Sequence, residues 1–365
     1  MQNEYAPESV SPPGGTLQDL LNEHQMAQAE LAARTGRPPR LINEIIRGKA
    51  SITPATALQF EKVFGVPAHF WLNRERDYQE YLERRKDQER IETQVRWLDC
   101  LPVRELRRRG HISGTRDKRE QVLECLRFFG VASPEAWRDV YETPQASFRR
   151  SRAFTSDPGA VAAWLRAGEL ISDQQVGTPC SRERLRSLIP KIRCFTMLDA
   201  VDLQRKLGEV CADVGVVIAF VPEVPGARVS GATRWLSPQR ALIQLSLRYK
   251  TDDHLWFTFF HEMGHILLHG KKDVFLEYDG GSSPEEQEAD RFSAEALIPP
   301  EDYRRLLKKG REVKGHWSKN LVKRFADEIG IAPGIVVGRL QHDGHLPRTH
   351  LNDLKRRFEW STSRK

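Results

Sequence analysis

The chain has 365 residues, of which 39% are apolar and 29% are charged, and this is enough for two or three domains with cores of their own. Its longest apolar run, residues 214–221, is far shorter than the roughly 20 residues that cross a bilayer, so we expect no membrane-spanning segment. The formal net charge of +7 is compatible with nucleic-acid binding, although many basic proteins bind no nucleic acid.

The N-terminus and the cysteines bear on the compartment. Residues 1–15 contain three prolines and two glycines but no basic segment followed by an apolar one, so we expect a disordered tail and no signal peptide. The five cysteines are scattered and never in C-x-x-C spacing. These features predict a cytoplasmic, reduced protein without a cysteine zinc site.

Residues 16–80 show the pattern of several short helices, expected at 17–23, 28–35, 38–46, 53–64 and from residue 67. The second and third are joined by Thr35-Gly36-Arg37, a short turn with a glycine, which is typical of a helix-turn-helix. The third helix has an apolar inner face. Side chains that can contact DNA lie on or near its outer face, and they are Arg37, Arg40, Asn43, Arg47 and Lys49.

Three runs in this region carry a family resemblance: Asn43-Glu44-Ile45-Ile46-Arg47-Gly48-Lys49, Ile52-Thr53-Pro54-Ala55-Thr56-Ala57-Leu58 and Phe64-Gly65-Val66-Pro67-Ala68-His69-Phe70-Trp71-Leu72-Asn73. They resemble the lambda-repressor-like (XRE) helix-turn-helix family, and more closely its HigA-type antitoxin branch. The resemblance implies a domain that binds a double-stranded DNA operator, and such domains usually read two half-sites as homodimers. The other interpretation is a helical protein-interaction module whose basic residues are only solvated. Pro38-Pro39 departs from a simple DNA reader because it leaves fewer backbone donors for a phosphate.

A charged region follows the helix-turn-helix. Residues 74–96 form a long helical pattern with charges of both signs, which is typical of a solvated connector and less so of an interaction surface. Several amphipathic helices come next, without a catalytic motif. The basic clusters 107–109 and 148–150 are interpreted as solvated faces, and the alternative is that they face DNA phosphates. We therefore predict a helical connector over residues 81–200.

Residues 201–350 change in character. A helix is expected at 201–214, and strands rich in branched residues are expected at 214–221, 228–236 and 241–247. The order predicts a small antiparallel sheet next to the helix that follows it. We expect Gln244 to Leu247 to be an edge that holds an extended substrate by strand addition.

The helix after these strands contains His261-Glu262-Met263-Gly264-His265, the pattern H-E-x-x-H. Two histidines four residues apart lie on one helix face and can share a tetrahedral cation, and Glu262 beside them can deprotonate a water held by the metal. An apolar stripe predicts that this helix is largely buried; it consists of Trp256, Phe259, Phe260, Met263 and Leu267. The pattern is that of a zinc peptidase.

A third ligand is needed to close such a site. His269 is excluded as a ligand with His261, because eight residues of helix rise about 12 Å. We expect His269 either to contact a ligand from outside or to be structural. Residues 283–297 predict another helix, on which Glu285 and Glu286 both lie near the inner face, and the helical wheel does not choose between them. Ser283-x-x-Glu286 is also a capping box, in which Glu286 would only close the start of the helix.

The H-E-x-x-H helix followed by E-x-x-A-D/N-x-F and a Leu-Ile-Pro ending resembles the ImmA/IrrE family of gluzincin-type metallopeptidases. The likeness includes residues 229–235, 243–246 and 338–344 and covers most of residues 201–350. It implies Zn²⁺ with Glu286 as third ligand, and Asp290 as a second-shell carboxylate that orients an imidazole. Candidates for a donor to the tetrahedral oxyanion are Tyr278, Tyr303 and His269.

The sequence thus predicts a mainly α protein with a C-terminal α+β domain. Its expected parts are a disordered tail (1–15), a helix-turn-helix DNA-binding domain (16–80), a helical connector (81–200), an ImmA/IrrE-like metallopeptidase domain (201–350) and a basic C-terminal tail (351–365). The predicted function is a DNA-binding transcriptional regulator with a zinc-dependent endopeptidase that cleaves a regulatory protein. The alternative is a HigA-like antitoxin whose metallopeptidase-like domain binds zinc or a partner, such as the cognate toxin, without proteolysis.

Overall fold

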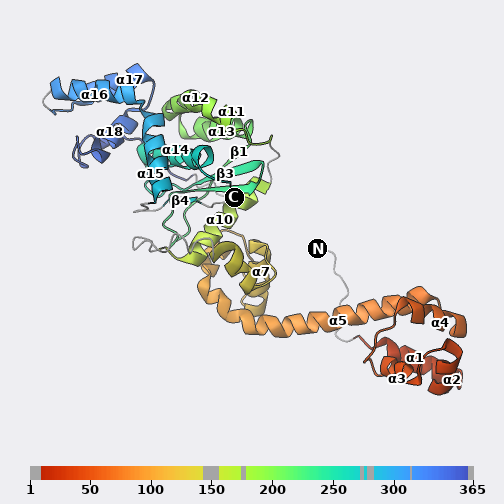
Figure 1. Ribbon diagram of the computed structural model, residues 1–365. Helices are drawn as coiled ribbons and strands as arrows, with labels where there is room; N and C mark the ends of the chain where they lie inside the picture. The colour runs from red at the N-terminus through yellow and green to blue at the C-terminus, as the bar shows by residue number, and fades with distance from the viewer. Residues whose placement is uncertain are drawn as a thin grey trace. The chain divides into compact units, whose positions relative to one another are not determined.

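The computed structural model describes residues 10–142, 156–173, 178–271, 275–277, 283–312 and 315–360 (Figure 1). The chain folds as two units, Met1–Val95 and Arg96–Lys365. Within the described residues, no helix is both long enough and apolar enough to span a membrane.

The first unit is helical: α1 (Pro13–Glu23), α2 (Gln28–Thr35), α3 (Pro39–Ile46), α4 (Pro54–Phe64) and α5 (Ala68–Gln94). Gly36 and Gly65 end α2 and α4 in the left-handed conformation that glycine adopts without strain. The tail predicted for residues 1–15 is too long, because α1 already begins at Pro13. Gly14 is buried in its first turn, where an added side chain would meet the backbone at the end of α3.

The core of the first unit is apolar and includes residues from all five helices. Phe60 of α4 and Trp71 of α5 are fully buried and their rings lie 5.2 Å apart. The connector predicted to begin at residue 81 instead starts inside a helix, since residues 68–94 contain no glycine or proline and α5 runs on unbroken. Beyond its first turns, α5 carries exposed ion pairs such as Arg84 with Glu80, as expected for a solvated helix.

The second unit begins within η1 (Val95–Cys100). Its next helices are α6 (Val103–Arg108), α7 (Lys118–Phe129), α8 (Pro134–Trp137), η2 (Arg138–Glu142) and α10 (Pro158–Asp173). These helices are not a free connector. Trp164 of α10 donates through Nε1 to the carbonyl of Val221, and Arg109 donates to the carbonyl of Pro222, which lies just beyond a strand of the sheet. The basic cluster 148–150 lies outside the described residues.

The next helices are α11 (Arg182–Ser187), α12 (Ile189–Cys194), η4 (Phe195–Met197) and α13 (Ala200–Ala212). They lead into a sheet of β1 (Val216–Phe220), β2 (Gly231–Ser237), β3 (Arg240–Leu245) and β4 (Phe275–Glu277), in the order β1-β3-β2-β4. The predicted strands exist, but the sheet is mixed and not antiparallel throughout, because β1 pairs in parallel with β3.

The sheet order also corrects the predicted substrate edge. In β3, Gln244 pairs with Ala219 of β1 on one side and with Ala232 of β2 on the other, so β3 is an inner strand. The fully buried Gln244 side chain donates to the carbonyl of Trp164 in α10. Its neighbour Ile243 faces the opposite way, into the core that contains α14 (Asp252–Leu268).

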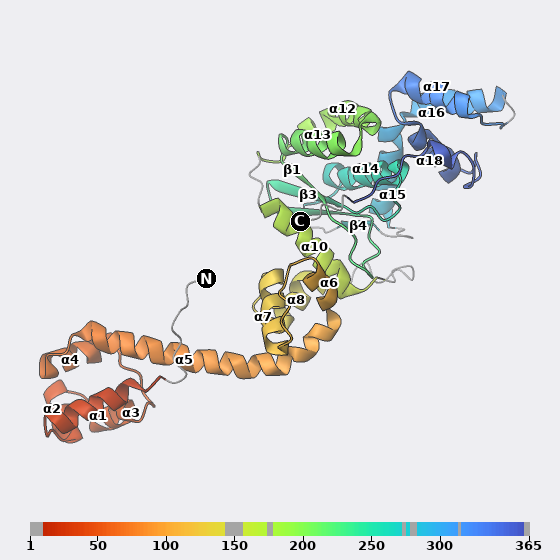
Figure 2. The same ribbon diagram turned by 180° about the vertical axis from the view of Figure 1, so that it is seen from behind.

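The two sheet faces are therefore covered by different helices, α10 on one and α14 on the other. In both views α15 (Pro284–Leu297) lies against α14 (Figures 1 and 2). The two helices approach closely at Gly264, where an added Cβ would be 3.0 Å from the Phe292 ring and 3.4 Å from the Cα of Ala289. This contact brings the two candidate metal-ligand helices together.

The chain ends with α16 (Pro300–Glu312), α17 (Lys319–Ile329), α18 (Pro333–His342) and η5 (Asn352–Leu354). Residues 351–360 are not a free tail: they bind the start of α14. Lys355 Nζ lies 2.6 Å from Asp253 Oδ2, and the backbone N–H of Arg356 donates to Asp252 Oδ1. Residues 361–365 lie outside the described residues. The predicted class, mainly α with a C-terminal α+β part, is confirmed.

Candidate metal centre

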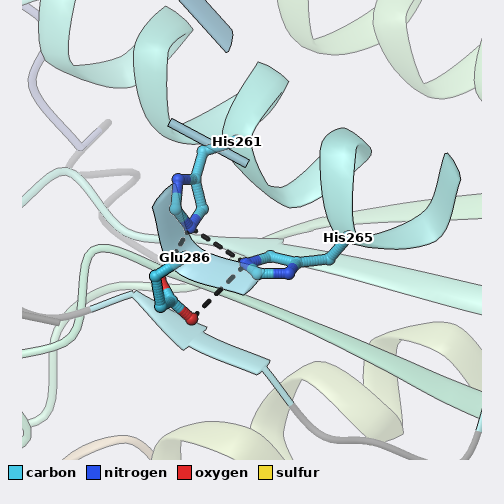
Figure 3. A group of neighbouring side chains, drawn as sticks. All are labelled: His261, His265 and Glu286. Atoms are coloured by element: carbon cyan, nitrogen blue, oxygen red, sulfur yellow. Dashed lines mark hydrogen bonds and ion pairs between the residues drawn. The ribbon is translucent and has the colours of Figure 1, made fainter. Parts of the chain in front are cut away.

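The H-E-x-x-H segment lies in the buried middle of α14. His261 and His265 are 1% and 0% exposed, and their Nε2 atoms lie 3.0 Å apart on one face of the helix (Figure 3). Glu262 is also fully buried. Its carbonyl oxygen accepts a hydrogen bond of 2.9 Å from the hydroxyl of Thr233 on β2, which fixes this turn of the helix to the sheet.

Glu286 reaches the two histidines from α15. Its Oε2 lies 3.1 Å from His261 Nε2, and its Oε1 lies 3.6 Å from His265 Nε2 (Figure 3). Ser283 caps α15 by accepting a bond from the backbone N–H of Glu286. Hydrogen bonds from its own backbone N–H and from Ser283 lower the pKa of the exposed Glu285, whose carboxylate is thus held at the helix start.

The three side chains have the chemistry and spacing that zinc requires. One atom from each of His261, His265 and Glu286 lies within 4.8 Å of the others. Zinc bonds of about 2.0–2.2 Å at tetrahedral angles hold ligand atoms roughly 3.3–3.6 Å apart, within a few tenths of an ångström of the distances here. Burial, and then the neighbouring His261 and His269, lower the pKa of His265 to about 2, which keeps this imidazole neutral as a ligand must be.

Each histidine has a further partner at its other ring nitrogen. Asp290 Oδ1 lies 2.9 Å from His261 Nδ1. His269 is the residue that follows α14; its Nδ1 lies 2.9 Å from His265 Nδ1 and its Nε2 lies 3.2 Å from Glu288 Oε2. Asp290 and His269 thus each contact one of the two imidazoles.

Two neighbours of the centre were not singled out from the sequence. Phe275 of β4 stacks on the His265 ring, with centroids 4.0 Å apart and planes 14° from parallel. Gly231 of β2 lies against Glu262, because a Cβ at this position would be 2.6 Å from Glu262 Oε1 and 2.5 Å from Thr258 Cγ2. The close approach at Gly231 could have been predicted, because a glycine inside a predicted strand often marks such a contact. The sequence of the three-residue strand β4 contains no feature that predicts the role of Phe275.

Of the three candidate oxyanion donors, Tyr303 and His269 lie in the described part of the chain, and both contact other side chains there. The Tyr303 hydroxyl donates to the carboxylate of Asp343. Burial, followed by this bond to Asp343, raises the pKa of Tyr303 to about 12. Both ring nitrogens of His269 lie against other side chains of the centre, and Tyr278 lies outside the described residues.

The predicted DNA-contacting residues lie in and around α3. Arg40 is exposed and pairs with Glu44 at 2.8 Å, and Arg47 and Lys49 are exposed at the end of the helix. Two others are turned toward neighbouring helices, since Arg37 donates to Gln59 of α4 and Asn43 donates to Gln28 of α2.

A comparison with curated proteins gives no significant match. Among solved structures, an addiction module antidote protein of the HigA family from Coxiella burnetii is 32% identical over 23% of this chain and 92% of its own, with a TM-score of 0.22. A putative antidote protein of a plasmid maintenance system from Nostoc punctiforme is 26% identical over 23% of this chain and 91% of its own, with the same TM-score. Pseudomonas aeruginosa antitoxin HigA with higBA promoter is 24% identical over 23% and 94%, again with a TM-score of 0.22.

Two family models match the chain. The Helix-turn-helix model matches residues 17–71, which are α1 to the start of α5. The model of the IrrE N-terminal-like domain, of peptidase family M78, matches residues 212–340, which include the sheet, α14, α15 and all three candidate ligands. The chain therefore carries an XRE-type helix-turn-helix DNA-binding domain at its N-terminus and an IrrE-like domain of the M78 peptidase family at its C-terminus.

Proposed function

We propose that this protein is a DNA-binding regulator whose M78 domain is a zinc-dependent endopeptidase that hydrolyses a peptide bond in a regulatory protein. The observation that carries the proposal is the buried group of His261, His265 and Glu286 with Glu262 between the two histidines on α14. Glu262 is fully buried and lies beside the two histidines on α14, and general-base catalysis is a task that suits a carboxylate at this position.

The residues divide the chemistry between them. His261, His265 and Glu286 would hold zinc, which when bound activates a water molecule and polarises a carbonyl group. Glu262 takes the proton of the attacking water and delivers it to the leaving amine. Asp290 and His269 hold the two imidazoles in the orientation that ligation needs, through contacts of 2.9 Å each.

The helix-turn-helix domain would direct this activity to a DNA site. We propose that the exposed side chains of α3 contact a double-stranded operator and that two copies bind two half-sites as a homodimer. The formal charge of +7 favours such a partner. The scattered, free cysteines agree with work in the cytoplasm.

The test compares wild-type protein with Glu262→Gln, both loaded with zinc and incubated with the purified product of the neighbouring gene. The variant should keep its zinc, because Glu262 is not a ligand, and should cleave about 100-fold more slowly or worse. Zinc content is measured by metal analysis and cleavage by mass spectrometry of the products. Cleavage by the variant at the wild-type rate would refute the mechanism.

The second candidate is a HigA-like antitoxin that binds zinc or a toxin without proteolysis. The observation that favours it is the sequence run over residues 43–73, which resembles that antitoxin branch. In this case a small ribonuclease encoded next to the gene should form a stable, uncleaved complex with the wild-type protein. If the ribonuclease forms a complex with Glu262→Gln but is cleaved by the wild-type protein, the result supports the peptidase function instead.

A further inference from the structure

Two cavities next to the candidate metal centre form one groove. Their volumes are about 470 Å³ and about 570 Å³. They have five lining residues in common, which are Tyr249, Asp253, His254, Gly338 and His342. The groove therefore continues from one cavity into the other along α14 and α18.

The first cavity borders the candidate centre through two residues, and the three candidate ligands and Glu262 are not among its lining residues. Asp290, which contacts His261, lines it. Thr258 also lines it, and this residue packs with Glu262 around Gly231. A side chain in this cavity is thus next to the position where a scissile bond would lie.

The walls of the first cavity are largely apolar, with Phe257, Leu297, Ile298 and Ile335 among them. Its three acidic groups are engaged: Asp290 lies against His261, Glu295 forms an ion pair of 2.8 Å with Arg291, and Asp253 forms one of 2.6 Å with Lys355. The cavity therefore favours an apolar side chain.

The second cavity is basic at its far end. Arg348, Lys355 and Arg357 line it. Lys355 is neutralised by Asp253 at 2.6 Å. Arg348 and Arg357 are exposed and form no ion pair with the described residues, so this end carries net positive charge.

We propose that this groove selects the substrate of the peptidase, and the proposal rests on the function proposed above. The substrate is a polypeptide segment with an apolar side chain next to the scissile bond, which enters the first cavity. Further along the same segment it carries acidic residues, which Arg348 and Arg357 bind. The apolar walls determine which bond is cut, and the two arginines determine which chains are bound.

The test uses zinc-loaded full-length protein and a library of fluorescence-quenched octapeptides that vary one apolar and one charged position. Wild-type protein should cleave peptides with a large apolar residue and an acidic residue at least tenfold faster than peptides with a small or basic residue at these positions. The charge preference should weaken as salt increases.

Two variants separate the two halves of the groove. Arg348→Glu with Arg357→Glu should reverse the charge preference. Ala294→Phe narrows the first cavity and should shift the preference to smaller apolar residues. Arg184→Glu is the matched control, because Arg184 is an exposed arginine that lines neither cavity.

Binding of the same peptides to Glu262→Gln, measured by fluorescence anisotropy, separates this inference from the proposed function. The expected binding preference without any wild-type cleavage would refute the peptidase and leave the groove supported. Cleavage without preference would overturn the proposed role of the groove in substrate selection. A preference that Arg348→Glu with Arg357→Glu does not change would overturn it too. A double reversal that weakens duplex DNA binding while peptide preference is unchanged would overturn it as well.

Discussion

Glu286 takes part in the cap of α15 and in the candidate metal centre through different atoms. Its backbone N–H donates to Ser283 Oγ at the start of α15, while its carboxylate oxygens lie 3.1 Å from His261 and 3.6 Å from His265. Capping and metal binding are therefore compatible in one residue. They are separable by mutation, since one uses the main chain and the other the side chain.

We predict that Glu286→Gln lowers zinc affinity by more than the roughly 10- to 100-fold that loss of an outer partner costs, because an anionic ligand is removed. Ser283→Ala is the matched variant. It should keep the zinc and destabilise the fold by about 0.5–2 kcal/mol, because only the cap is lost. Competition with a chelator measures zinc affinity and thermal unfolding measures stability. Unchanged zinc affinity in Glu286→Gln would exclude the ligand role.

At this scale helical periodicity identified the two histidines but left Glu285 and Glu286 open, and only the family resemblance pointed to Glu286. His261 and His265 are placed by the helical repeat alone, because both lie on one helix. Glu285 and Glu286 are adjacent on another helix, and the choice between them depends on how α15 is rotated against α14. That rotation is set by the close contact at Gly264, which a helical wheel of one segment does not contain.

The contact between β2 and α14 positions the proposed base. Thr233 donates to the carbonyl of Glu262, and two residues earlier Gly231 lies against the Glu262 carboxylate. Both residues are on the same face of β2, as the two-residue repeat of a strand requires. The strand thus supports the helix backbone and leaves just enough room for the carboxylate.

We predict that Gly231→Ala lowers the turnover number about tenfold or more and leaves zinc content unchanged. The added Cβ would lie 2.5 Å from Thr258 Cγ2 and 2.6 Å from Glu262 Oε1 and so displace the carboxylate, whereas none of the three atoms nearest to it belongs to a candidate ligand. Gly208→Ala on α13 is the control, because a Cβ there meets nothing within 4 Å. Equal activity of the two variants would show that the approach of Gly231 does not position Glu262.

The sheet shows why its strands could be predicted from the sequence and why their order in the sheet could not. Branched, apolar runs located β1, β2 and β3 to within a few residues. The parallel pairing of β1 with β3, however, joins segments separated by all of β2, and alternation within a strand carries no information about its neighbours. For this reason Gln244 was expected at an edge and lies in an inner strand.

The whole chain combines two units whose chemistry is separate. The helices that match the Helix-turn-helix model belong to Met1–Val95, and the candidate metal centre belongs to Arg96–Lys365. The linear sequence predicted both parts. It placed their boundary at residue 80, inside α5, because a charged helix has the same pattern on both sides of a domain boundary.

We predict that DNA binding and zinc chemistry respond to different substitutions. Arg40→Ala with Arg47→Ala should weaken binding to a duplex selected from a random pool by roughly tenfold or more, and flatten its dependence on salt, because an exposed cation of α3 and another directly after it are lost. Zinc content and peptide cleavage should not change.

Arg85→Ala is the control, because it removes the same kind of charge from α5 in the same unit. It should alter duplex binding by less than about twofold, since an exposed charge outside the contact surface contributes little. An equal loss in Arg85→Ala would mean that net charge, and not α3, holds the DNA; a loss of cleavage in the α3 variant would mean that the two units do not work separately.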